Sequence, residues 1–164
     1  MKPLTADQIR SSFVNCSQTA AKRISLPDLD GQPWDDLDLL GWADPSGSTT
    51  SYLVTERADG TLIGFLLKQA RPRAGTSRQG MCSLCRTVHP ASDIALMTAT
   101  RPGPRGRAGD SRGNYLCADL ACSLYVRGRK LPARVQPAET LTPEQKVARL
   151  QRNLAALVAW LGAE

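Results

Sequence analysis

Histidine is almost missing from this sequence: the chain of 164 residues contains one, His89. A single histidine leaves little apparatus for general acid–base catalysis or for hydrolysis at a catalytic metal. The sequence also lacks a phosphate-binding loop, a nucleophile elbow, a Rossmann fingerprint and a zincin motif. These absences predict a protein that is not an enzyme.

Long apolar runs are missing too. No segment could cross a bilayer, and the start, Met1-Lys2-Pro3-Leu4-Thr5-Ala6-Asp7-Gln8, has no apolar core of a secretory signal. Aromatic residues make up only 5% of the chain, so the core should be mainly aliphatic. We expect one soluble domain over residues 1–164, monomeric, cytoplasmic and without a membrane partner.

Four of the five cysteines form two close pairs. Cys82 and Cys85 are separated by two residues, and Cys117 and Cys122 by four, with 31 residues between the pairs. Two disulfides, a redox dithiol at Cys82 and Cys85, or unrelated buried thiols are the alternatives to a metal site. Stable disulfides are rare in a reducing cytosol. The pattern therefore favours one structural Zn²⁺ held by all four thiolates.

The remaining cysteine and the histidine have simpler interpretations. His89 follows the first pair closely and could replace one ligand, but four cysteines already satisfy zinc. We therefore expect a loop histidine beside the metal. Cys16 lies in an apolar stripe and is predicted to fill the core.

Capping and periodicity signals place the elements along the chain. A capping box at Thr5 and apolar residues at helical spacing predict one helix over about 5–24. Asp59-Gly60 between two β-rich runs predicts a hairpin over 51–57 and 61–68. Further strands are expected at 94–99 and 114–116, and a helix from 118 to about 126. A second capping box at Thr142 opens a C-terminal helix over about 142–161.

The order of these elements predicts a particular fold class. The predicted order is that of a treble-clef zinc finger: first a cysteine knuckle, then a long hairpin, then a helix that carries the last ligands. We therefore expect an α+β domain: a treble-clef zinc finger with β-hairpins and a zinc-binding core over about 50–130. An N-terminal and a C-terminal α-helix flank it. The apolar stripe of the C-terminal helix should pack on the core; the alternative is a helix for a partner or a second copy.

Charge is distributed unevenly along the chain. Residues 1–60 carry 5 Lys and Arg against 9 Asp and Glu, whereas residues 61–137 carry 13 against 3. The acidic group Asp35, Asp36 and Asp38 is expected to be solvated or to cap a helix. Residues 70–80 should be a basic, flexible connection. The excess of positive charge near the cysteines suits a polyanion or an acidic protein face.

Several segments together resemble a known family. They surround the cysteines and also lie upstream of them: Met81-Cys82-Ser83-Leu84-Cys85, the run from Tyr115 to Gly128, Ser12-Phe13-Val14-Asn15-Cys16, Pro33-Trp34-Asp35-Asp36-Leu37-Asp38, and Leu40-Gly41-Trp42. These resemble the treble-clef zinc-finger domain of the elongation factor G-binding proteins, the fusidic acid resistance proteins of FusB type and their relatives. The similarity covers most of the chain. By this resemblance, the chain looks shorter at its N-terminus than the resistance members, which carry a larger helical bundle there.

The resemblance implies four zinc-binding cysteines and elongation factor G as partner, on or near the ribosome. In resistance members, binding promotes release of the factor from ribosomes stalled by fusidic acid. Contact with the ribosome or ribosomal RNA is a further expectation. We hypothesise that the partner meets a basic surface made of Arg86, Arg105, Arg107, Arg112, Tyr115 and Arg127. A general RNA-binding zinc finger is the main alternative, although few aromatic residues lie near the basic region. A thiol oxidoreductase is a remoter one.

Overall fold

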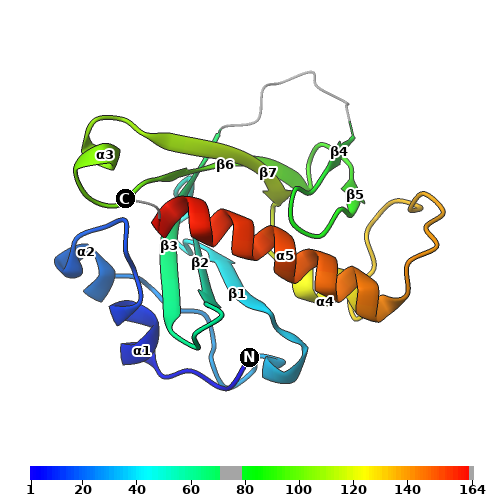
Figure 1. Ribbon diagram of the computed structural model, residues 1–164, viewed down its shortest axis with the longest axis horizontal. Helices are drawn as coiled ribbons and strands as arrows, with labels where there is room; N and C mark the ends of the chain where they lie inside the picture. The colour runs from blue at the N-terminus through cyan, green and yellow to red at the C-terminus, as the bar shows by residue number, and fades with distance from the viewer. Residues whose placement is uncertain (71–78, 163–164) are drawn as a thin grey trace.

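The computed structural model describes residues 1–70 and 79–162, and these form an α+β fold (Figure 1). A five-stranded antiparallel sheet has the strand order β1-β2-β3-β6-β7. Its strands are β1 (Leu39–Ala43), β2 (Thr50–Glu56), β3 (Leu62–Gln69), β6 (Ile94–Thr100) and β7 (Ser111–Cys117). The short strands β4 (Gly80–Met81) and β5 (Val88–His89) pair separately. The α+β prediction is confirmed.

The predicted β2–β3 hairpin is present, and both of its faces are covered. Gly60 at the turn has φ +80°, and the Asp59 carboxylate accepts hydrogen bonds from the Thr61 amide and hydroxyl. Leu53 belongs to one buried cluster, whereas its neighbours Tyr52 and Val54 belong to another. Because successive side chains of a strand point to opposite faces, the sheet separates two cores.

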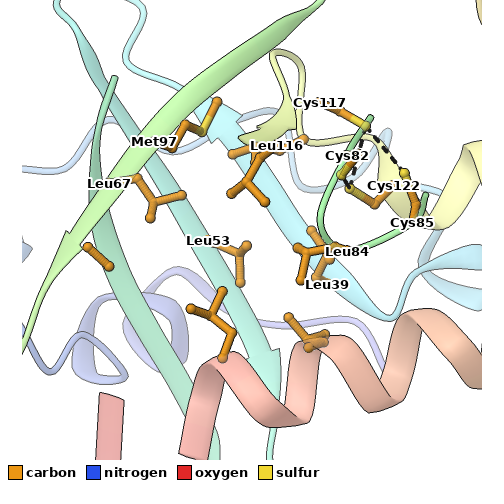
Figure 2. Close-up of a cluster of buried hydrophobic side chains, with 14 of the residues drawn as sticks. Leu39, Leu53, Leu67, Cys82, Leu84, Cys85, Met97, Leu116, Cys117 and Cys122 are labelled. Carbon is orange, nitrogen blue, oxygen red and sulfur yellow. Dashed lines mark hydrogen bonds between the residues drawn. The ribbon is translucent and has the colours of Figure 1, made fainter. Parts of the chain in front are cut away.

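One core lies between the sheet and the C-terminal part of the chain. The long helix α5 (Pro143–Gly162) crosses this face in Figure 1, and the shorter α4 (Cys122–Val126) packs beside it. Figure 2 shows the buried side chains, in which the four paired cysteines continue the aliphatic cluster of Leu39, Leu53, Leu84, Leu116 and Met97. The cysteine site is therefore part of the main core.

The helix α5 begins and packs as its sequence predicts. The Thr142 hydroxyl accepts from the Gln145 amide at 3.3 Å and the Gln145 side chain accepts from the Thr142 amide at 2.9 Å, so the capping box is formed. Most of its apolar stripe is buried, namely Leu150, Leu154, Leu157 and Leu161, while Val147 and Trp160 are half-buried. The prediction that this helix packs on the domain core is confirmed.

The prediction of one N-terminal helix over about 5–24 is wrong. The chain instead forms α1 (Ala6–Ser11) and α2 (Gln18–Lys22), which cover the second core. Between them Phe13 forms a bridge to Gly64 of β3, and the Val14 amide donates to the Gly64 carbonyl at 2.9 Å. A Cβ on Gly64 would lie 2.5 Å from the Ser12 hydroxyl, so the close approach needs glycine. Tertiary pairing has overridden the helical periodicity.

The remaining short elements complete the chain. The 3-10 helix η1 (Trp34–Asp36) precedes β1, and α3 (Gly103–Arg107) lies at the turn between β6 and β7, where the sequence predicted only a loop. The basic connection predicted over 70–80 lies mostly outside the described residues, which omit 71–78. Among the described helices, none has both the length and the apolarity needed to span a membrane.

Candidate metal centre

Three kinds of local structure deliver the four sulfurs. Cys82 and Cys85 lie in the turn between β4 and β5, where the Arg86 amide donates to the Cys82 carbonyl at 3.0 Å. Arg86 has φ +66°, a left-handed conformation that closes this turn tightly. Cys117 ends β7, and Cys122 is the first residue of α4. A knuckle, a strand and a helix start therefore meet at one point.

The distances between the sulfurs fit a tetrahedral metal. The Sγ atoms of Cys85 and Cys117 are 3.4 Å apart, those of Cys82 and Cys122 are 3.7 Å apart, and all four lie within 4.8 Å of one another (Figure 2). Zinc–sulfur bonds of about 2.3 Å at tetrahedral angles place ligand sulfurs about 3.8 Å apart. All four cysteines are at most 2% exposed. The cluster is thus closed and can hold one metal ion.

The electrostatics of the cluster also call for a cation. Hydrogen bonds from Cys117 and then Cys122 hold the pKa of Cys85 well below its usual range. The hydrogen bond with Cys117 contributes most to raising the pKa of Cys122. The sulfurs thus shift one another's pKa in opposite directions, because buried thiolates at this distance repel one another. A bound divalent cation would remove this competition, because it stabilises all four thiolates together.

His89 lies beside the cysteine group. Its Nε2 is 3.2 Å from the Cys117 Sγ, and its ring meets the Tyr125 ring edge-on at 4.9 Å. Hydrogen bonding with the Cys85 sulfur raises the pKa of His89, which favours a ring that donates N–H to thiolate. The group of metal-binding geometry in the described chain consists of the four cysteines alone. His89 is therefore placed to orient and stabilise a thiolate ligand.

The fifth cysteine, Cys16, does not belong to the metal-binding group. Cys16 is half-buried against the second core, and burial raises the pKa of its thiol. A protonated, packed thiol is a poor nucleophile and a poor ligand. This agrees with the predicted role of a core residue.

The six residues predicted to meet a partner are not brought together. Arg86 and Tyr115 lie at the cysteine end of the β6–β7 hairpin, both exposed, and Tyr115 is 55% accessible. Arg105 and Arg107 lie on α3 at the opposite end, with Arg112 close to it on β7. Figure 1 shows α3 and the β4–β5 pair at opposite ends of this hairpin. The predicted surface is therefore divided into two.

Arg127 lies apart from both. It is on the segment after α4, half-buried, and its Nη1 is 2.5 Å from the Asp38 carboxylate. The sequence predicts a solvated or helix-capping role for Asp38, but its side chain is only 7% exposed and pairs with Arg127. Nothing in the local pattern signals this ion pair, since its partners are 89 residues apart. Asp36 forms a more exposed pair with Arg129, as a surface carboxylate does.

The sequence also gave no indication of an apolar patch on the hairpin. Leu96 of β6 and Tyr115 of β7 are direct cross-strand partners, and both are exposed. The exposed Met81 lies on the neighbouring β4. Side chains alternate along β6, so Leu96 and its neighbours point to opposite faces. The sequence alone does not say which of these faces is exposed.

The knuckle, the β6–β7 hairpin and the helix that begins at Cys122 together define a treble-clef finger. A family model described as the FBP C-terminal treble-clef zinc-finger matches residues 8–161, and the chain belongs to this family. The match covers the N-terminal helices as well as the cysteine site. The resemblance inferred from the sequence segments is therefore confirmed.

Comparison with solved structures gives the same fold. The chain is similar to the structure of the fusidic acid resistance protein FusC, with 19% identity and a TM-score of 0.56. The similarity covers 75% of this chain and 52% of the FusC chain, so it spans about half the length of that protein. No match was found among curated proteins.

Proposed function

We propose that this protein is a non-enzymatic, zinc-stabilised adaptor that binds elongation factor G and modulates its release from the ribosome. Membership of the treble-clef family and the fold shared with a fusidic acid resistance protein support this proposal. Tolerance to fusidic acid would follow from this activity and has its own test below. The zinc ion would stabilise the fold of the finger and would take no part in the reaction of elongation factor G.

The observation that carries the proposal is the distribution of exposed apolar side chains. Among the described residues, every large hydrophobic side chain that is exposed lies between residues 81 and 135: Met81, Leu96, Tyr115, Leu131 and Val135. Leu96 and Tyr115 stand next to each other across two strands. An apolar pair on a rigid sheet next to exposed Arg86 is suited to a protein partner.

The redox alternative is disfavoured by access. A dithiol that exchanges electrons with a partner needs a sulfur that the partner can reach. Cys82 is fully buried and Cys85 is 2% exposed. One tightly bound zinc per chain would exclude this alternative.

Isothermal titration calorimetry of the zinc-loaded protein against purified elongation factor G, without ribosomes or RNA, tests the proposal. We expect a one-to-one complex with a Kd on the order of 1 μM or tighter. Replacing Leu96 and Tyr115 together by Ala should weaken it at least about tenfold, because both would be central contacts. Leu131→Ser removes an exposed hydrophobic side chain that lies outside the sheet, and it should leave the Kd for elongation factor G unchanged.

Two results would contradict the proposal. Failure of the zinc-loaded protein to bind the factor would remove the adaptor function. Equal losses in the Leu131 variant and in the double variant would remove the sheet face from the interface. Given binding, translation in vitro with fusidic acid then tests tolerance: added protein should restore synthesis, and the Leu96 and Tyr115 variant should not.

A further inference from the structure

The far end of the β6–β7 hairpin carries a separate charged surface. It contains four arginines, Arg101, Arg105, Arg107 and Arg112, which we call the arginine tip. Between residues 101 and 113 the only acidic residue is Asp110. Arg105, Arg107 and Arg112 are exposed, whereas Arg101 is 9% exposed. The tip thus presents a local excess of positive charge.

The tip is held in place by contacts with the C-terminal helix. The Arg101 guanidinium lies 4.8 Å from the centre of the Trp160 ring, and that of Arg112 lies 5.9 Å from it. Asp110 lies within 3.3 Å of Arg101 and 3.2 Å of Arg105, so it bridges two of the arginines. The positive charges are therefore anchored on a rigid base of cation–π contacts and ion pairs.

Two arginines of the tip, Arg107 and Arg112, can pair with an anionic ligand. Within residues 1–70 and 79–162, neither Arg107 nor Arg112 has a carboxylate within ion-pair distance. Two glycines of the tip add open backbone: an added Cβ at Gly103 or Gly109 would meet no atom within 4 Å. Exposed guanidinium groups beside bare backbone suit a ligand with many anionic oxygens at close approach.

The chemistry of the tip differs from that of the Leu96–Tyr115 face. No large hydrophobic side chain is exposed among residues 101–113. Trp160 is half-buried beneath the arginines, so its ring is not available for stacking with bases. Arg112 and Tyr115 are three residues apart on β7, about 10 Å along a strand. The two surfaces can therefore serve two partners.

We infer that the arginine tip binds the phosphate backbone of structured RNA. Arginine binds phosphate well, and the tip lacks both the apolar anchors of a protein interface and the stacking platforms of a base reader. Recognition is therefore of shape and charge, without dependence on base sequence. This inference does not rest on the proposed function, because RNA binding is measured without elongation factor G.

Fluorescence anisotropy with a labelled RNA duplex of about 16 base pairs tests the inference. The zinc-loaded protein should bind, with an affinity that falls steeply as salt rises. Replacing Arg107 and Arg112 together by Glu should weaken binding at least about tenfold and lower the salt slope by about 2, one for each lost phosphate contact. A second duplex of unrelated sequence should bind equally well.

The matched control reverses the same amount of charge elsewhere. Lys2 near the N-terminus and Arg152 on the exposed side of α5, both replaced by Glu, should leave RNA affinity within about twofold of wild type. Zinc content and the melting temperature establish that each variant is folded. If the Arg112 change disturbs the Trp160 contact, Arg107→Glu alone provides the test, and Arg107→Lys should retain most of the binding.

Three outcomes would overturn the inference. The first is that the wild-type protein does not bind RNA, and the second is that the tip variant and the control variant lose equal RNA affinity. The third is that the tip variant keeps its RNA affinity but no longer binds elongation factor G. The last would assign the tip to a protein interface. If the tip variant loses RNA binding while its Kd for elongation factor G stays the same, the result supports two separate surfaces. A protein that binds RNA through the tip but does not bind the factor would contradict the adaptor function alone.

Discussion

One residue, Asp38, connects four parts of the chain through its buried carboxylate and its backbone. Its two oxygens accept from both Nη atoms of Arg127, and Oδ1 also accepts from Gln151 Nε2 at 2.9 Å. Its amide donates to the Ser123 hydroxyl, and its carbonyl accepts from the Thr55 hydroxyl. The residue thereby joins the start of β1 to β2, α4 and α5. Its negative charge is compensated by Arg127 and Gln151, which is what a buried carboxylate requires.

We therefore expect Asp38→Ala to destabilise the zinc-loaded protein by about 3 kcal/mol. The substitution leaves the half-buried Arg127 without its partner, and an uncompensated charge costs more than the pair itself contributes. Urea unfolding followed by circular dichroism measures the loss. Asp36→Ala is the matched control, because its pair with Arg129 is exposed and should be worth less than about 1 kcal/mol. Equal losses would refute a special role for Asp38.

The element that holds the N-terminal segment against the sheet is the extended turn between α1 and α2. The Asn15 side-chain amide donates to the carbonyls of Leu66 at 2.9 Å and Thr100 at 3.1 Å, and its oxygen accepts from the Leu66 amide at 2.7 Å. Asn15 thus satisfies backbone groups of β3 and β6 where the two strands diverge. The last paired residues of β3 and β6 before this point are Leu67 and Ala99.

Asn15→Ala should reduce the free energy of unfolding by about 2 kcal/mol. Three hydrogen bonds are lost, and partly buried backbone groups of two strands are left without partners. The midpoint of urea unfolding should fall with little change in its slope. Gln18→Ala, at an exposed position on α2, is the control and should change stability by less than about 0.5 kcal/mol. A loss as small for Asn15 would mean that packing of Phe13 alone holds the segment.

The same elements show how much of the fold the sequence could predict. The helix α5 and the β2–β3 hairpin were predictable because their signals are local: a capping box, an apolar stripe and an Asp-Gly turn. The break between α1 and α2 was not, because the partners of Asn15 lie 51 and 85 residues away. A helical period alone cannot reveal a strand that will accept the chain.

The candidate site divides in the same way. Cysteine spacing selects the four sulfurs that the fold brings together, because the choice of ligands depends on chemistry and short spacing. The partner surface could not be derived so simply, since basic residues close in sequence lie at both ends of a hairpin. Arg127 is drawn inward by Asp38, a contact that only the tertiary fold creates.

At the scale of the whole molecule, the cysteine site and the main core are one body. The buried cluster that contains the four cysteines also contains strand residues such as Leu53 and Met97, and Leu150 and Leu157 of α5. The second core, with Phe13, Trp42 and Tyr52, lies on the other face of the sheet. A metal at the cysteines closes the loop from 82 to 122, which contains β6 and β7. Metal binding and folding of this half should therefore be coupled.

Removal of the metal by excess chelator should lower the melting temperature by about 10 °C or more. Structural zinc contributes free energy directly to folding, and a loss of a few kcal/mol produces a shift of this size in a chain of this length. Cys122→Ser should have the same effect and abolish stoichiometric zinc. Cys16→Ser is the control: it should keep one zinc per chain and melt within a few degrees of wild type, because Cys16 lies in the other cluster.

The two cores predict which part loosens first. Trp160 packs against the cysteine-containing cluster, whereas Trp42 is buried in the other. On chelation, fluorescence of the Trp160 side chain should shift to the red before that of Trp42, as separate single-tryptophan variants would report. The basic surface at Arg101 and Arg112 rests on Trp160, so RNA affinity should fall with the same dependence on chelator. Simultaneous changes at both tryptophans would mean instead that the metal holds the whole fold as one cooperative unit.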